Sequence, residues 1–110
     1  MTDLAQQTLR QAQALMERGE ISSVELTTAV VDRILVRDNS VRAYLTLAPE
    51  LALEQAASAD QRRASGDQHP LLGIPLAIKD LICVKGLPNT CGSRILEDSV
   101  PTFNATVIEK

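Results

Sequence analysis

Glycine and proline divide this sequence into two parts near Gly66. Eight of the ten glycine and proline residues lie at or after that position. Glycine lowers helix stability and proline lacks an N–H donor, so the first part favours helices and the second favours strands and loops. A chain of 110 residues can hold one core and is too short for two. The pattern predicts an α/β architecture in which helices of residues 1–66, with one short strand, pack on a sheet that begins in residues 67–110.

Composition excludes several classes of protein. The net charge is −3 and aromatic residues make up only 2% of the chain, which disfavours direct binding to nucleic acid. Arg62 and Arg63 could be taken as a nucleic-acid contact, but on an alanine-rich helix end they are better explained as a solvated face that complements the helix dipole. Residues 1–19 contain no continuous apolar run, so we expect a cytoplasmic protein without membrane contact.

Two amphipathic helices are predicted in the first forty residues. The first is capped by Thr2 or Asp3 and ends at Gly19; its apolar face consists of Ala5, Leu9, Ala12 and Met16. The second begins at Ser22, which forms a capping box with Glu25. Its apolar stripe consists of Leu26, Ala29, Val30 and Ile34, and we expect it to end near Asp38 and Asn39.

Three further elements are predicted after residue 40. Alternating apolar residues predict a strand over residues 41–47. Pro49 suits the first turn of a third helix that ends near Gly66, with a narrow face of Ala52, Ala56 and Ala59. Asn104 is expected to cap a last helix, which has no stop signal before Lys110. This suggests that the chain is an N-terminal fragment of a larger enzyme.

Lys79 is the residue most suggestive of chemistry. It follows the uncharged run 70–78, in which residues 76–78 are predicted to form a buried strand. Burial lowers the pKa of a lysine, and a neutral amine can act as a general base. The alternative is a lysine that extends to water or pairs with Asp80, itself either an orienting group or a turn residue.

An ordered set of motifs resembles the opening of the amidase signature family. The segments are Gly73-Ile74-Pro75-Leu76-Ala77-Ile78-Lys79-Asp80, Gly86, Thr90-Cys91-Gly92-Ser93, Pro101 and Ala105-Thr106-Val107. Within the family, residues 82–86 and 91–97 look most like the branch that works as the A subunit of aspartyl/glutamyl-tRNA amidotransferases. The resemblance implies the amidase signature fold, incomplete in this chain.

The resemblance also implies amide hydrolysis by a serine nucleophile, a second serine in a cis peptide, and a lysine. Lys79 matches the lysine and is the one catalytic residue assigned here. Both serines are expected downstream of this chain, so the 110 residues alone should be inactive. Leu81 stands where many members have asparagine, which puts a polar contact near the lysine in doubt. Asn104 stands where many have aspartate and would still cap a helix. Neither departure affects the assignment of Lys79.

The same branch suggests the reaction and the partners. Ammonia released from glutamine would convert misacylated Glu-tRNA(Gln) or Asp-tRNA(Asn), with B and C subunits completing a heterotrimer. ATP and Mg²⁺ would be used by the B subunit, which also handles the tRNA, and this chain would hold no cofactor or metal. A stand-alone amidase for another small amide, or a docking fragment without catalysis, are the alternatives.

The cysteines and the single histidine carry weaker signals. Cys83 and Cys91 have no metal-site spacing and are expected to be free, largely buried thiols. One of them could serve as a thiol nucleophile with Lys79, but no motif supports that role. His69 lies in a polar loop and is expected to be exposed to solvent.

Overall fold

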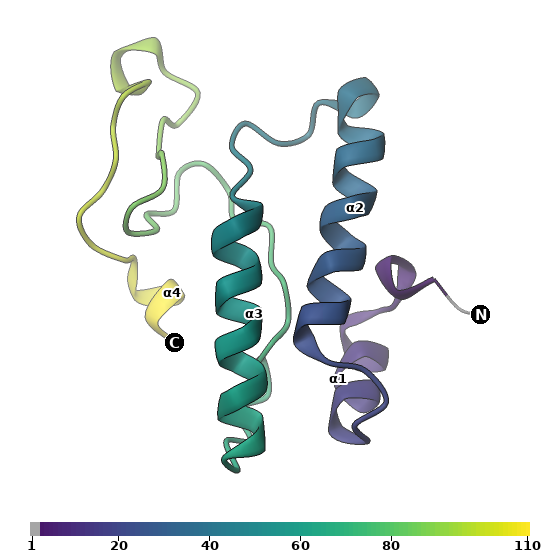
Figure 1. Cartoon of the computed structure of the whole chain (residues 1–110). Coiled ribbons are helices and arrows are strands. Elements are labelled where there is room, and N and C mark those ends of the chain that lie inside the picture. Colours follow the sequence, from purple (N-terminus) through teal and green to yellow (C-terminus); the bar gives the residue numbers. More distant parts are fainter. Residues whose placement is uncertain (1–2) are drawn as a thin grey trace. The chain divides into compact units, whose positions relative to one another are not determined.

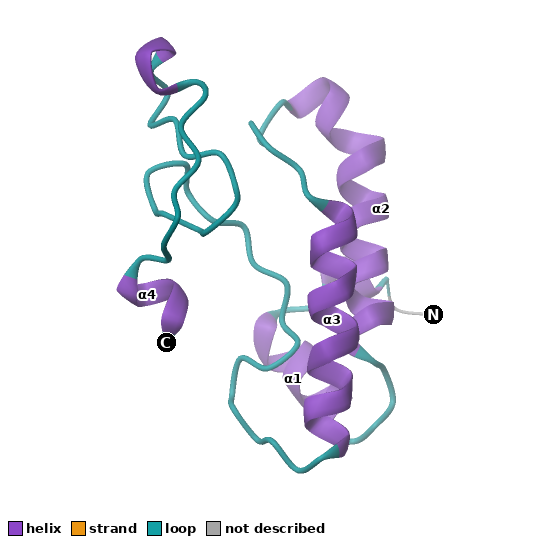
Figure 2. Cartoon of the chain, turned by 60° about the vertical axis from the view of Figure 1, so that its left-hand side comes forward, coloured by secondary structure: helices purple, strands orange, loops and turns teal. Residues whose placement is uncertain are grey.

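The computed structural model describes residues 3–110, and all regular structure in that range is helical (Figures 1 and 2). The elements are η1 (Leu4–Gln6), α1 (Leu9–Glu17), α2 (Ser23–Val41), α3 (Pro49–Ala64), η2 (Arg94–Leu96) and α4 (Thr106–Glu109). Two compact units form. The helical unit comprises residues up to 43 together with 47–76, and the loop unit comprises residues 44–46 and 77–110. No helix in the described range is both long and apolar enough to cross a membrane.

Neither predicted strand forms within the described residues. Val41 is the last residue of α2, and residues 42–47 are an exposed connection that begins with Arg42 in the left-handed region, at φ 53°. Residues 76–78 run without a ladder partner and are also exposed. Because a strand needs a neighbour to satisfy its backbone groups, alternation in sequence alone does not produce one here. The regular structure of residues 3–110 is therefore entirely helical, and the sheet of the α/β prediction does not form in them.

The predicted first helix is split in two. Asp3 caps η1 by accepting a hydrogen bond from the Ala5 N–H at 2.9 Å, while Thr2 lies outside the described residues. The α-helix begins only after Thr8, which forms a capping box with Gln11. That reciprocal pair satisfies two backbone donors and fixes the start of α1.

The capping box at the start of α2 is confirmed. The Ser22 hydroxyl accepts from the Glu25 N–H at 3.0 Å, and the Glu25 carboxylate accepts from the Ser22 N–H at 2.7 Å. The helix continues to Val41, slightly beyond the predicted end. Asp38 explains this extension, because its backbone carbonyl accepts from the N–H of Arg42 and its carboxylate accepts from the N–H of Ala43.

The third helix matches its prediction closely. Pro49 occupies the first turn, and the helix lies beside α2 (Figure 1). Ala56 and Ala59 are buried and Ala52 is half-buried, so the predicted alanine face is the covered face of the helix. The core of the helical unit is small: Ala12, Met16 and Leu26 are buried, and half-buried Leu4, Ile21, Val30 and Ile74 pack against them.

A polar junction fixes the first turn of α2, and we call the residues Ser23, Asp60 and Gly73 the Ser23 junction. The Asp60 carboxylate on α3 accepts from the N–H groups of Ser23 at 2.7 Å and Val24 at 3.1 Å. The Ser23 hydroxyl donates to the Gly73 carbonyl at 2.7 Å. A carboxylate at a helix N-terminus satisfies free donors and complements the helix dipole. The junction thus joins α2, α3 and the segment after α3.

Backbone hydrogen bonds organise the loop unit. The N–H groups of Gly86, Asn89 and Ala105 donate to the carbonyls of Pro101, Ser99 and Cys83, at 3.1, 2.9 and 2.8 Å. Contrary to the prediction, Asn104 does not cap α4, and Ala105 takes that position. The Asn104 side chain instead accepts from the Lys85 N–H at 2.7 Å, so it connects two loop segments.

Replacing Asp60 should weaken the helical unit. We expect Asp60→Ala to lower the free energy of unfolding by about 1–2 kcal/mol, because two N–H groups at the start of α2 lose their acceptor. Urea unfolding followed by far-ultraviolet circular dichroism measures the change. Asp32→Ala, at an exposed position on α2, is the matched control. Equal stability of the two variants would contradict the role given to Asp60.

Gly73 should tolerate no side chain. Its φ is +80°, and a Cβ built there lies 2.9 Å from the Ser23 Cβ. We expect Gly73→Ala to cost about 2–4 kcal/mol, from left-handed strain plus overpacking. The control is Gly19→Ala, which has a similar φ of +69° and nothing within 4 Å, and which should show the strain alone. The same unfolding measurement separates the two contributions.

Candidate active-site segment

Lys79 lies at the end of an extended segment that solvent reaches. Leu76 and Ile78 are 60% and 41% exposed, and Lys79 is also exposed. The sequence predicted a buried strand that ends in a lysine shielded from water. Neither is present, because nothing in residues 3–110 pairs with this segment as a strand or covers it. None of the ion pairs in that range includes Lys79, so the expected alternative of a pair with Asp80 is not formed either.

Asp80 holds the chain immediately after Lys79. Its carboxylate accepts from the Thr90 N–H at 2.8 Å and from the Thr90 hydroxyl, and its backbone carbonyl accepts from the Cys91 N–H at 2.9 Å. The Ile82 N–H donates to the Lys79 carbonyl at 2.9 Å, closing a turn. Asp80 is thus a turn residue whose side chain joins two loops.

These contacts lower the pKa of Asp80. The hydrogen bond from the Thr90 hydroxyl is the largest cause, followed by the backbone N–H of Thr90, while desolvation opposes them and the Gly92 N–H adds a smaller lowering. Donors to the ionised form stabilise it. The carboxylate therefore remains charged, and it keeps the turn after Lys79 attached to residues 90–92 over the neutral pH range.

Sequence reasoning did not identify Thr90 as the partner of Asp80. The two residues are ten positions apart and no periodicity connects them. The preference of aspartate for local backbone donors could have suggested a turn, but not which loop would supply the hydroxyl.

Both cysteines are free thiols, but they differ in burial. Cys83 is partly buried and Cys91 is exposed, at a left-handed φ of 50°, so the prediction of largely buried thiols is wrong for Cys91. The amide of Asn89 contacts both sulfurs. Within residues 3–110, no group of three or more histidine, cysteine, aspartate or glutamate side chains could hold a metal ion.

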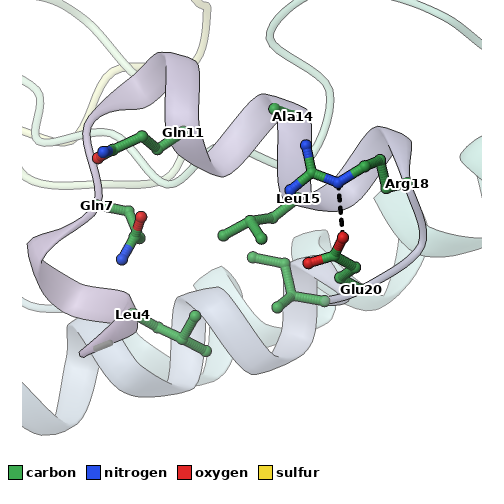
Figure 3. Close-up of a pocket in the computed structure, with 8 residues that line it drawn as sticks. Leu4, Gln7, Gln11, Ala14, Leu15, Arg18 and Glu20 are labelled. Atoms are coloured by element: carbon green, nitrogen blue, oxygen red, sulfur yellow. Dashed lines mark hydrogen bonds and ion pairs between the residues drawn. The ribbon is translucent and has the colours of Figure 1, made fainter. Parts of the chain in front are cut away.

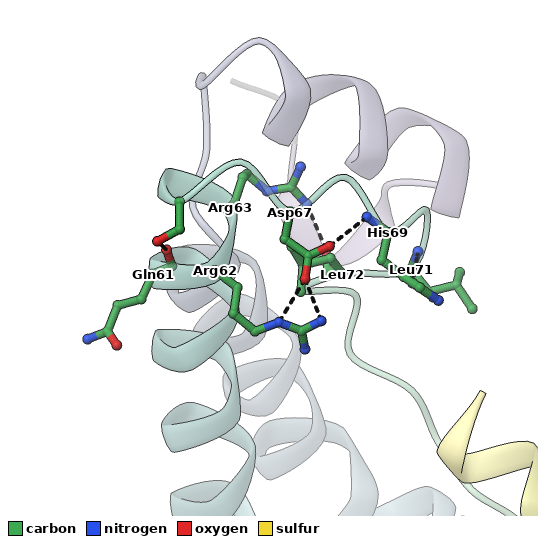
Figure 4. A network of polar contacts seen from close by, with 8 residues as sticks. Gln61, Arg62, Arg63, Asp67, His69, Leu71 and Leu72 are labelled. Atoms are coloured by element: carbon green, nitrogen blue, oxygen red, sulfur yellow. Dashed lines mark hydrogen bonds and ion pairs between the residues drawn. The ribbon is translucent and has the colours of Figure 1, made fainter.

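His69, Arg62 and Arg63 belong to a structural network at the end of α3 (Figure 4). Asp67 accepts from the His69 N–H at 3.0 Å and forms an ion pair with Arg62. Arg63 donates to the Leu72 carbonyl at 2.7 Å. His69 is exposed, as expected. Both arginines lie in the last turn of α3, where they complement the helix dipole as predicted, but only Arg62 is exposed, and half-buried Arg63 departs from the expected solvated face.

The helical unit contains an open pocket of about 400 Å³ (Figure 3). Leu4, Leu15 and Ile21 line its apolar part, and Arg18 pairs with Glu20 at 2.6 Å at its edge. Among the described residues that line it there is no lysine, serine, cysteine or histidine. Lys79 is likewise not among the described residues that line it.

Comparison with known protein families gives a direct result for most of the chain. The model of the family described as Amidase matches residues 25–110, which include Lys79 and the whole loop unit. The chain belongs to the amidase family. This confirms the resemblance carried by the motifs around Lys79.

Curated relatives identify the branch of the family. The chain is 56% identical over 103 residues to the A subunit of the glutamyl-tRNA(Gln) amidotransferase of Desulfosudis oleivorans, covering 94% of this chain and 21% of that protein. It is 46% identical to the corresponding protein of Dehalococcoides mccartyi and 51% identical to that of Roseiflexus sp., each over 110 residues and 23% of the relative. The chain therefore spans between a fifth and a quarter of the length of these relatives.

The contact between Asp80 and Thr90 can be tested by titration. Thr90→Val removes the hydroxyl, so we expect the pKa of Asp80 to rise toward its ordinary value of 3.8, with the backbone donors still holding it lower. Carboxyl ¹³C chemical shifts measured against pH report this change. Thr102→Val, at an exposed position of the same unit, should leave the titration unchanged.

The same titration predicts how stability depends on pH. Because the folded pKa of Asp80 lies below its unfolded value, the interaction stabilises the fold at pH values above the unfolded pKa and is lost as pH falls through the folded pKa. The acid-induced loss of stability of the loop unit should therefore be smaller in Thr90→Val. An unchanged acid transition would contradict this role of Thr90.

Proposed function

We propose that this chain is the N-terminal part of the glutamine-hydrolysing A subunit of a tRNA-dependent amidotransferase. The observation that carries the proposal is the match of almost the whole chain, at 46–56% identity, to the A subunits of glutamyl-tRNA(Gln) amidotransferases. The match includes the segment in which Lys79 follows an uncharged run. Fold alone would not indicate a reaction, whereas a lysine placed in this motif does.

Lys79 would act as the base of the reaction. In the proposed mechanism its uncharged amine takes the proton of a serine nucleophile through a bridging serine, and the nucleophile then attacks the side-chain amide carbonyl of glutamine. Collapse of the tetrahedral intermediate releases ammonia and leaves an acyl-serine that water hydrolyses. Both serines would be supplied by chain outside these 110 residues, so the isolated chain should be inactive.

Such a base needs an environment that disfavours the ammonium form. The exposed apolar side chains of Leu76, Ile78 and Leu81 support an arrangement in which further chain covers this segment. We propose that residues 76–79 then join a sheet of the amidase signature fold and that Lys79 becomes buried. Asp80 would hold the end of this segment in register through Thr90.

The wider reaction follows from the same assignment. The ammonia would convert misacylated Glu-tRNA(Gln) or Asp-tRNA(Asn), in a cytoplasmic complex with B and C subunits. ATP and Mg²⁺ would be used at the B subunit, and we assign no residue of this chain to either. Copurification with B- and C-type subunits would separate this function from that of a stand-alone amidase.

A chimeric protein tests the proposal. Residues 1–110 would replace the corresponding part of the Desulfosudis oleivorans relative, and the assembled complex would be assayed for ammonia release from glutamine. We expect the chimera to be active and Lys79→Ala to lower kcat by at least about 10³-fold, as removal of a base does in serine hydrolases. Lys85→Ala, the nearest other lysine and also exposed, is the matched control and should retain activity.

Two outcomes would contradict the proposal. One is an active chimera whose glutaminase rate is the same with Lys79→Ala as without it. The other is glutamine turnover by the purified 110-residue chain that survives Lys79→Ala, since that would place the chemistry elsewhere.

A further inference from the structure

Cys83 and Cys91 are held on the two polar atoms of a single amide group. The Asn89 Nδ2 atom donates to the Cys83 sulfur at 3.6 Å, and the Cys91 thiol donates to the Asn89 Oδ1 atom at 3.5 Å. The chain has only these two cysteines, so only one intramolecular disulfide is possible. The proposed amidase function uses neither contact, so the chemistry of the two thiols is independent of it.

Backbone contacts keep the two cysteines in place independently of that amide. The Cys91 N–H donates to the Asp80 carbonyl at 2.9 Å, and the Cys83 carbonyl accepts from the Ala105 N–H at 2.8 Å. Asn89 is buried, but its amide contacts the two sulfurs through weak hydrogen bonds, so turning it away from them breaks no strong contact to the thiols. For a disulfide to form, the amide must turn away and the two sulfurs must approach to about 2.05 Å.

The two thiols differ in access to solvent. Cys91 is exposed, whereas Cys83 is partly buried. An exposed thiol with a less accessible cysteine beside it is the arrangement of an attacking and a resolving cysteine. We propose that Cys83 and Cys91 form a reversible disulfide on contact with a small-molecule disulfide oxidant such as oxidised glutathione.

The chemistry balances in two exchange steps. The Cys91 thiolate attacks one sulfur of oxidised glutathione, forming a mixed disulfide and releasing one glutathione thiolate. The Cys83 thiolate then attacks the Cys91 sulfur and releases the second glutathione. Two electrons pass from the cysteines to the oxidant, and the two protons lost from the cysteines are taken up by the two glutathione thiolates.

Redox equilibration of the 110-residue chain tests this inference. The chain is incubated in glutathione buffers of increasing oxidised share, quenched in acid, alkylated and analysed by mass spectrometry. We expect the mass of the chain to fall by that of two hydrogen atoms. After digestion, a disulfide should link the tryptic peptides 80–85 and 86–94. The folded loop should raise the effective concentration of one thiol at the other by at least about tenfold over the value in concentrated urea.

Single substitutions test the order of attack. Cys83→Ser should accumulate the mixed disulfide on Cys91, and Cys91→Ser should react much more slowly at Cys83. Equal rates in the two variants would overturn Cys91 as the attacking thiol. Glutathione on both cysteines without a link, disulfide-linked dimers as the main product, or the same equilibrium in urea would each overturn the disulfide itself.

Discussion

The start of α2 is the point on which the helical unit depends. The first N–H groups of a helix have no partner within it, and α2 begins against neighbours that exclude water from Ser23. Asp60 supplies the missing acceptor from α3, while the Ser23 hydroxyl binds the carbonyl of Gly73. Three segments are thus fixed by one short set of hydrogen bonds. The apolar core around Met16 is too small to position them alone.

Local signals in the sequence were sufficient for α2 and α3, but they did not predict the break between η1 and α1. The capping box of Ser22 and Glu25, the proline at the start of α3 and the buried face of Ala56 and Ala59 all depend on residues within a few positions of one another. The contact between Ser23 and Asp60 joins residues 37 positions apart, and no periodicity encodes it. The expected strands were wrong for a related reason, since a strand is defined by a partner that the local sequence does not contain.

In the candidate site, too, local features were predictable from the sequence and contacts between distant residues were not. Motif order placed Lys79 at the end of an uncharged run, and the family match includes that segment. The surroundings of the lysine could not be predicted from the run itself, because burial depends on what packs against it. Asp80 was foreseen as a turn residue, yet its partner Thr90 and the position of Cys91 beside Asn89 follow from how two loops meet. The family motif was thus easier to recognise from the sequence than the contacts that its residues make.

The contacts of the helical unit end at residue 76, and this has a consequence for biosynthesis. Every partner of the Ser23 junction has left the ribosome once Gly73 emerges, so α2 and α3 can dock before the lysine segment is complete. Folding can then proceed in the direction of translation. The exposed apolar residues that come after residue 76 would then emerge when the helical unit has already folded.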